Sequence, residues 1–373
     1  MGTRMHGGLI AALVAVVVVG FTLSTRATAN AHGPTPAIRH LFIIMMENRR
    51  TDQIIGNTTD APYINQLAAR YNLATNYYGV THPSLPNYLA LLSGDTQGIF
   101  DDCKPGAAVT CPPAEFIPGK EYPGLLLTDA QVAYEQGQPH LFAGQNLVDQ
   151  LEAHGMSWRA YMESLPATGY TGEYFGHRLY AAKHNPFVYF SDITTNPTRM
   201  ARIAPFTLPG FAHDLTGAMP NLVWISPSQC NDMHDLSTEN ATAEHLAACA
   251  KSDGGADHSV IQLGDHYLSQ VVPMIMRSRA WGEGAAIAVV WDENDYSGWT
   301  GCCHSPVGVQ GTTLGGGNAP AIFITSRGGA RVSDATAYNH YSLLATIERL
   351  WGLGCLANAC GFRDNELLLH YLL

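Results

Sequence analysis

Four short apolar runs constrain the fold of this 373-residue chain more than any other feature. They read HLFIIMM at 40–46, NLVWIS at 221–226, AAIAVVW at 285–291 and PAIFITS at 320–326, and turn-forming or polar residues bound each one. Continuous apolar runs of this length are typical of strands that a parallel sheet buries on both faces. The sequence therefore predicts a mostly parallel central sheet.

Helical patterns lie between these runs, at PYINQLAARY near 62, QNLVDQLEAHG near 145, 258–276 and 341–353. Strands that alternate with helices predict an α/β fold with helices on both faces of the sheet. The length allows one large domain with a full core, and the chain contains no internal repeat and no linker that would divide it. The segment 95–140 is rich in Gly, Pro and Asp and is predicted to be a surface insertion.

The N-terminus has the pattern of a secretory signal peptide. Arg4 precedes an apolar stretch at 9–23, and Ala29-Asn30-Ala31 has the form of a cleavage site. We therefore expect 1–31 to be removed and 32–373 to form a single secreted domain. A retained membrane anchor is the competing interpretation, since the apolar stretch is only somewhat short for a span. After cleavage the sequence predicts no stable membrane span.

The charge of the chain argues against a nucleic-acid partner. Its 20 basic and 31 acidic residues give a net charge of -11, and removal of Arg4 and Arg26 with the signal changes -11 to -13. No basic stripe is left to neutralise a phosphate backbone.

Eight cysteines in a chain with an export signal indicate disulfides rather than a Cys metal site, because no two Cys-x-x-Cys motifs occur. Three pairs would close local loops and one pair is adjacent: Cys103 and Cys111, Cys230 and Cys249, Cys355 and Cys360, and Cys302 and Cys303. Spacing alone does not fix the connectivity.

Acidic and polar residues follow three of the predicted strands. They are Glu47 and Asn48 after 40–46, Asp292 and Glu293 after 285–291, and Asp232, His234 and Asp235 after 221–226. Ligands bind beyond the carboxyl ends of strands in such sheets. Carboxylates gathered in one site resist ionising together, and a divalent cation would remove that conflict. The alternative is that these acids only cap helices and solvate loops, but three coincident strand ends favour a metal site, with the metal's identity open.

The segment THPSLPNYLALLSG at 81–94 predicts a helix, because Pro86 is tolerated in a first turn and an apolar face follows. Ser84 lies at its start and either caps the helix or acts as a nucleophile. A helix N-terminus favours an anionic substrate such as phosphate. In that hypothesis Asn87 donates to a phosphoryl oxygen and His234 is the general acid. Four further histidines have two equally open interpretations, a buried side chain with its hydrogen bonds satisfied or a functional residue: His82, His184, His304 and His340.

Several motifs resemble one known family. They are MMENRRTDQIIG at 45–56, THPSLPNYLALLSG at 81–94, NDMHD at 231–235, GDHYLSQVVPMI at 264–275, WDEND at 291–295 and YNHYSLLATIERLWGL at 338–353. In this order they are similar to the bacterial phosphoesterase family of the alkaline phosphatase superfamily. That family holds secreted acid phosphatases and phospholipase C enzymes, and the likeness is closest to its compact acid phosphatases, including those that act on phosphatidylinositol 3-phosphate.

The resemblance implies an alkaline-phosphatase-like α/β/α sandwich and a metal held by Glu47, Asn48, Asp292 and Glu293. It also implies that Ser84 is phosphorylated and that Asn87 contacts the phosphate. His340 matches the histidine of the family's Asp-His-x-Ser, with Asn339 in place of Asp, and His304 lies at the nearest match to Asp-His-Val-Pro. The chain departs from the family's Ser-Phe-Asp at 49–52, which reads RRTD.

The sequence therefore predicts a secreted, metal-dependent acid phosphatase that acts on a phosphorylated small molecule or a phospholipid head group. Six further residues are expected to bind substrate or support the site: His82, His184, Asp232, Asp235, His304 and His340. A phospholipase C or other phosphodiesterase using the same site is the nearest alternative, although the long C-terminal extension of the larger members is missing. A metal-free serine esterase that uses Ser84, a histidine and an aspartate is a further alternative. The chain does not contain the Gly-x-Ser-x-Gly motif that is typical of such esterases. A binding protein with a decayed site is the remaining alternative.

Overall fold

The computed structural model describes residues 1–3, 38–106, 127–236, 249, 258–328 and 331–373. Residues 36–373 gather into one compact unit. The predicted signal peptide and its boundary at 31 fall almost entirely outside the described residues, so both stay predictions.

Within the described residues, the unit is built on an eight-stranded sheet with β1 near its centre. The strands, in spatial order, are β11 (Ser333–Asp334), β2 (Asn72–Ala74), β10 (Ala321–Thr325), β9 (Ala285–Trp291), β1 (His40–Met46), β8 (Leu222–Ser226), β4 (Trp158–Glu163) and β7 (Ile203–Phe206). All pairings are parallel except those that β10 makes with β9 and β2. The predicted mostly parallel α/β fold is confirmed.

One strand runs opposite to the prediction. The run at 320–326 was expected to be parallel, but β10 is antiparallel to β9. Among the described elements, only the short 3₁₀ helix η3 (Val309–Gly311) lies in the connection between β9 and β10. Without a crossover helix, the chain returns from the edge at which β9 ends, and the next strand must run back.

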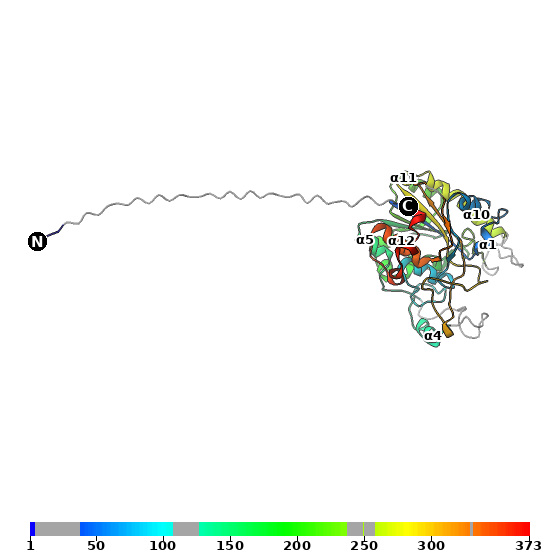
Figure 1. The fold of residues 1–373 in the computed structure, drawn as a ribbon, viewed down its shortest axis with the longest axis horizontal. Coiled ribbons are helices and arrows are strands. Elements are labelled where there is room, and N and C mark those ends of the chain that lie inside the picture. The colour runs from blue at the N-terminus through cyan, green and yellow to red at the C-terminus, as the bar shows by residue number, and fades with distance from the viewer. Residues whose placement is uncertain (4–37, 107–126, 237–248, 250–257, 329–330) are drawn as a thin grey trace. The chain divides into compact units, whose positions relative to one another are not determined.

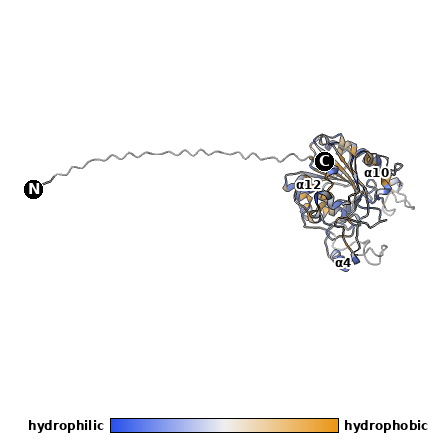
Figure 2. Ribbon diagram, in the orientation of Figure 1, coloured by the Kyte–Doolittle hydropathy of each residue, from blue (hydrophilic) through white to orange (hydrophobic). Residues whose placement is uncertain are grey.

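Helices cover both faces of the sheet (Figure 1). Leu41 and Ile43 of β1 pack with α3 (Ser84–Ser93), α5 (Leu147–Ala153) and α12 (His340–Trp351). Phe42 and Ile44 pack with α2 (Pro62–Arg70), α8 (Leu208–Asp214) and α10 (His258–Met276). In Figure 2 the sheet between these helices is largely orange, the colour of hydrophobic residues. The arrangement gives two apolar cores on the two sides of one sheet, as expected for a three-layer sandwich.

The helices have the following bounds: α1 Thr51–Ile54, α2 Pro62–Arg70, α3 Ser84–Ser93, α4 Asp129–Gln136, α5 Leu147–Ala153, α6 Ser191–Thr194, α7 Pro197–Met200, α8 Leu208–Asp214, α10 His258–Met276, α11 Arg279–Gly282, α12 His340–Trp351 and α13 Leu369–Leu372. The remaining short elements are β3 Tyr77–Tyr78, β5 Tyr174–Phe175, β6 Tyr180–Ala181, β12 Tyr338–Asn339, η1 Ala182–His184, η2 Pro186–Tyr189, η4 Ala357–Gly361 and η5 Asp364–Glu366. Among the described helices, none has both the length and the apolar character that a membrane crossing requires.

Three disulfides join cysteines close in sequence: Cys230 to Cys249, Cys302 to Cys303, and Cys355 to Cys360. Cys103 is also disulfide-bonded, while Cys111 lies outside the described residues. In the predicted insertion at 95–140, 107–126 is likewise outside them, and α4 follows.

Candidate active site

Three neighbouring parallel strands end at one edge of the sheet and deliver acidic residues there. Met46 of β1 pairs with Trp291 of β9, so Glu47 and Asp292 follow in register. Beyond β8, the Asp232 carbonyl accepts a hydrogen bond from the Glu47 N–H at 2.8 Å. The predicted clustering at the strand ends is therefore present.

Glu47, Asp232, Asp292 and Glu293 make up this carboxylate cluster, and all four are buried. Asp292 Oδ1 accepts from the backbone N–H groups of Asn48, at 3.2 Å, and Glu293, at 2.7 Å. The Asn48 side chain lies against Glu47 and Glu293, and its amide nitrogen would donate to Glu47 Oε2 over 3.2 Å and to Glu293 Oε1 over 3.1 Å. Carboxylates gathered beside an amide side chain in this way offer the types of ligand that a hard divalent cation prefers.

Burial opposes ionisation of these acids. Burial and the charges of Asp292 and Asp232 raise the pKa of Glu47 well above its usual range, and burial raises the pKa of Asp292 to about 6. Burial likewise raises the pKa of Glu293 and of Asp232. Asp292 Oδ2 is buried and accepts no hydrogen bond from the described residues. Glu47, Asn48, Asp292 and Glu293 therefore fit a divalent cation, which would offset the repulsion among the carboxylates.

Ser84 is the first residue of α3 and follows Pro83 at the N-cap. Its hydroxyl does not cap the helix but donates to Glu47 Oε2 at 2.8 Å, and the side chain is buried. Tyr88, one turn further on, donates a very short hydrogen bond to Glu47 Oε1. The sequence indicated Tyr88 only as part of a buried face, because its partner becomes adjacent only in the fold.

Asn87 has its amide engaged by the loop before the helix. Its oxygen accepts from the N–H groups of Val80 and Thr81, and its nitrogen donates to the carbonyls of Thr81 and Pro83. It also lies 3.3 Å from Glu293 Oε2. The phosphate contact expected of Asn87 stays a prediction, and these contacts favour a role in positioning the loop.

His82 and His340 are buried beside the carboxylate cluster. His82 Nδ1 lies 2.7 Å from Glu293 Oε2, and His340 Nε2 lies 2.6 Å from the Asp292 carbonyl oxygen. Burial lowers the pKa of His82 to about 3 and that of His340 to about 4, so both rings are neutral near pH 7. Both histidines contact the residues expected to hold the metal and orient them.

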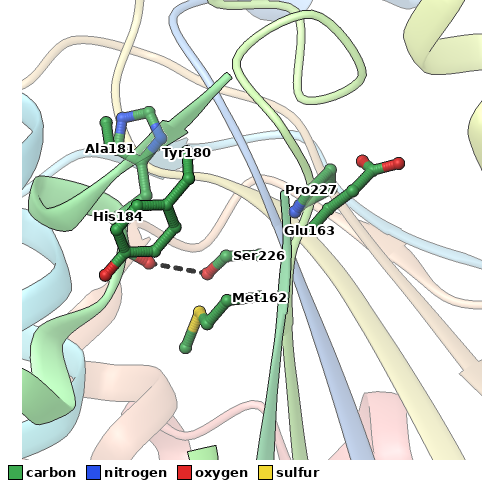
Figure 3. Close-up of a pocket in the computed structure, with 7 residues that line it drawn as sticks. All are labelled: Met162, Glu163, Tyr180, Ala181, His184, Ser226 and Pro227. Carbon is green, nitrogen blue, oxygen red and sulfur yellow. Dashed lines mark hydrogen bonds between the residues drawn. The ribbon is translucent and has the colours of Figure 1, made fainter. Parts of the chain in front are cut away.

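His184 bridges two of the acids. Its Nε2 lies 3.2 Å from Glu47 Oε1, and its Nδ1 lies 3.2 Å from Asp232 Oδ2. Figure 3 shows its backbone held at the end of β8, where the Ser226 hydroxyl donates to the His184 carbonyl at 2.7 Å. One potential metal-binding atom each of Glu47, His184 and His234 lie within 4.8 Å of one another.

His234 is bonded to a lysine that the sequence analysis did not single out. Lys183 Nζ lies 2.9 Å from His234 Nε2 and 2.9 Å from Asp102 Oδ2. Because an ammonium group only donates, Nε2 must accept, and the proton of the neutral ring lies on Nδ1, 3.1 Å from the Asp235 carbonyl oxygen. In this arrangement His234 has no proton on Nε2 to give, so the predicted general-acid role requires Lys183 to move.

Asp235 and His304 take other positions. The Asp235 backbone donates from its N–H to the Gln229 carbonyl, and its carbonyl oxygen lies 3.1 Å from His234 Nδ1. His304 is exposed, packs edge-on against Phe362 and lines a surface hollow with Tyr341. Among the described residues, the ring contact of His304 is with Phe362, and the side chain lies at this hollow rather than at the carboxylate cluster.

The chain is similar to known proteins over most of its length. A model of the Phosphoesterase family matches residues 57–253 and 248–354. A probable acid phosphatase of Kluyveromyces lactis is 27% identical over 323 residues, which cover 85% of this chain but 59% of that protein. The phosphatidylinositol-3-phosphatase of Mycobacterium tuberculosis is 28% identical over 362 residues, covering 94% of this chain and 90% of that protein.

A solved structure of an alkaline phosphatase superfamily protein from Vibrio parahaemolyticus is also similar, with a TM-score of 0.47 and 12% identity. It covers 84% of this chain and 67% of that one. The family match and the names of the two relatives support the predicted enzyme class, a hydrolase of phosphate esters.

Proposed function

Because the chain belongs to the Phosphoesterase family, we propose that it is a metal-dependent phosphatase that hydrolyses phosphate monoesters through a phosphoserine on Ser84. The observation that carries this proposal is the hydrogen bond from Ser84 Oγ to Glu47 Oε2, made at the N-terminus of α3 and beside four buried carboxylates. A hydroxyl held there faces a site suited to an anion.

The proposed reaction has two steps. As Ser84 Oγ attacks phosphorus, its proton passes to Glu47 Oε2, and the bond from phosphorus to the alcohol oxygen breaks on the opposite side as that oxygen takes a proton. Water then attacks the phosphoserine and gives a proton to the group that protonated the alcohol. The bond from phosphorus to Oγ breaks, phosphate is released, and Oγ recovers its proton from Glu47. The N–H groups at the start of α3 stabilise the negative charge on the phosphoryl oxygens.

His234 is proposed as the group that protonates the departing alkoxide. Its Nε2 accepts from Lys183 in the arrangement observed, so it becomes an acid only after Lys183 has turned away and Nε2 has taken a proton.

The cation would be held by Glu47, Asn48, Asp292 and Glu293. When bound, it supplies positive charge that neutralises the carboxylates and the phosphoryl oxygens. The buried Asp292 Oδ2, which accepts no hydrogen bond from the described residues, supports this assignment.

The substrate is proposed to be a phosphorylated small molecule or a phospholipid head group. The names of the relatives, an acid phosphatase and a phosphatidylinositol-3-phosphatase, support a monoester over a diester. The signal-peptide pattern at 1–31 supports secretion, which the N-terminal sequence of protein recovered from culture medium would test.

The test is hydrolysis of p-nitrophenyl phosphate by the purified protein, with and without chelator, for wild type, Ser84→Ala and Ser93→Ala. Ser93 is a matched control because it lies on the same helix and donates to the Leu89 carbonyl. We expect chelation and Ser84→Ala each to abolish turnover and Ser93→Ala to retain it. Activity that survives chelation would favour a metal-free esterase, and activity on phospholipid diesters alone would favour the phospholipase C alternative.

A further inference from the structure

In the proposed reaction Lys183 only leaves His234, and its positive charge has no role of its own. It lies in η1, which follows directly on the β5–β6 hairpin, and its side chain is 11% exposed. The carboxyl groups of Glu47 and Glu293 are fully buried. The Lys183 side chain is therefore more exposed than these two carboxyl groups.

The charge of Lys183 acts on the whole carboxylate cluster. It lowers the pKa of each of four acids, Glu47, Asp232, Asp292 and Glu293, against the larger effect of burial. A buried ammonium near four acids is expected to stay charged, and its own pKa is raised because Asp102 and Glu47 outweigh burial. The site thus contains the positive charge of the Lys183 ammonium in addition to the residues that could hold a metal.

Asp102 links Lys183 to the helix that carries Ser84. Its Oδ1 accepts from the Leu85 N–H at 2.9 Å, and its Oδ2 accepts from Lys183 Nζ at 2.9 Å. The ammonium is therefore fixed one carboxylate away from the N-terminus of α3. Two of its three donors are engaged by Asp102 and His234, and the described residues offer no acceptor to the third.

The bond to His234 is the one that a substrate can replace. A neutral imidazole nitrogen is a weaker acceptor for an ammonium than an anionic phosphoryl oxygen, whereas the Asp102 carboxylate is not. A phosphate that enters the site would accept a hydrogen bond from the third N–H of the Lys183 ammonium and then from the N–H now bonded to His234. The hydrogen bond from Lys183 to Asp102 would remain.

We propose that Lys183 binds a non-bridging oxygen of the substrate phosphoryl group and that this binding takes its ammonium off His234 Nε2. The inference rests on the proposed function and deepens it, since Lys183 becomes a residue that binds the phosphoryl group and releases His234 when it does so. Asp102 is a positioning residue, which acts through Lys183.

The experiment measures binding of inorganic phosphate to the full chain by calorimetry, in the presence of the divalent cation, together with kcat and KM for p-nitrophenyl phosphate. The variants are Lys183→Met, Lys183→Gln and Lys183→Arg, and the control is Lys104→Met, which removes an exposed charge two residues from Asp102. We expect the Met and Gln variants to bind phosphate about tenfold to a hundredfold more weakly, with Arg in between and the control unchanged.

Phosphate binding and turnover, measured on the same proteins, separate the inference from the proposed function. Phosphate affinity within twofold of wild type in both Lys183→Met and Lys183→Gln, or no phosphate binding by wild type, overturns the inference. A wild type that binds phosphate through Lys183 but does not turn over supports the inference and removes the proposed function. If Lys183→Met fails to fold, Lys183→Gln and Lys183→Arg carry the comparison.

Discussion

At the scale of single residues, Glu47 organises the candidate site. One carboxylate oxygen accepts from Ser84 and the other from Tyr88, and the side chain also contacts His184. The sequence pointed to Glu47 and Ser84 because each follows a recognisable strand or starts a recognisable helix. Tyr88, Lys183 and Asp102 carry no such local signal, since only the tertiary fold brings their partners to them.

Asn87 gives the first prediction at this scale. Asn87→Ala removes the partners of four buried backbone groups, so we expect the free energy of unfolding to fall by about 3 kcal/mol. Urea denaturation of the two proteins measures this difference. If stability were unchanged while phosphate affinity fell, the phosphate contact expected from the sequence would be correct and the positioning role wrong.

At the scale of elements, α12 couples the site to the rest of the core. Asn339 caps this helix and donates to the carbonyls of Cys302 and Cys303. The next residue, His340, is hydrogen-bonded through Nε2 to the Asp292 carbonyl oxygen. Towards its C-terminus, Glu348 is buried against α5 and accepts from Gln150 at 3.0 Å.

Glu348 makes the stability of the protein depend on pH. Burial raises its pKa from 4.5 to about 7, so the folded state binds a proton that the unfolded state has lost, and stability falls as pH rises from 4.5 through 7. Glu348→Gln removes this loss. Denaturant unfolding should show a gain on the order of 3 kcal/mol at pH 8 and little change at pH 4. An equal effect at both pH values would contradict this account.

The elements also show what the sequence predicts and what it does not. The runs at 40–46 and 285–291 coincide with β1 and β9, because unbroken apolar strands are recognisable without context. The sequence does not predict β4 or β7, because β4 reads WRAYME and has charged residues among its apolar ones, whereas β7 has only four residues and contains Pro205, which is uncommon inside strands. The direction of β10 depends on the path of a long connection, which local sequence does not encode.

At the scale of the whole molecule, the parallel strands concentrate like charge at one edge of the sheet. Like charges brought together in this way oppose folding, and a bound cation would offset their repulsion. In the proposed function, the stability and the activity of the molecule would therefore depend on the same ion.

Adding a divalent cation to chelator-treated protein should therefore raise its melting temperature. Binding at 100 times the Kd stabilises by about 2.7 kcal/mol. Because the carboxyl groups have raised pKa values, protons compete with the cation, and the gain should be smaller at pH 5 than at pH 7.5. Scanning calorimetry on wild type and Glu293→Gln measures it. A gain that persists undiminished in Glu293→Gln would remove Glu293 from the proposed ligands.

We propose above that Ser84 becomes phosphorylated during turnover. To test this, the metal-loaded enzyme is mixed with p-nitrophenyl phosphate and quenched in acid within the first turnovers, and phosphate is mapped on the peptides by mass spectrometry. We expect one phosphate on the peptide that contains Ser84, and none in Ser84→Ala. Turnover by wild type with no phosphopeptide, or with phosphate on another residue, would contradict the claim.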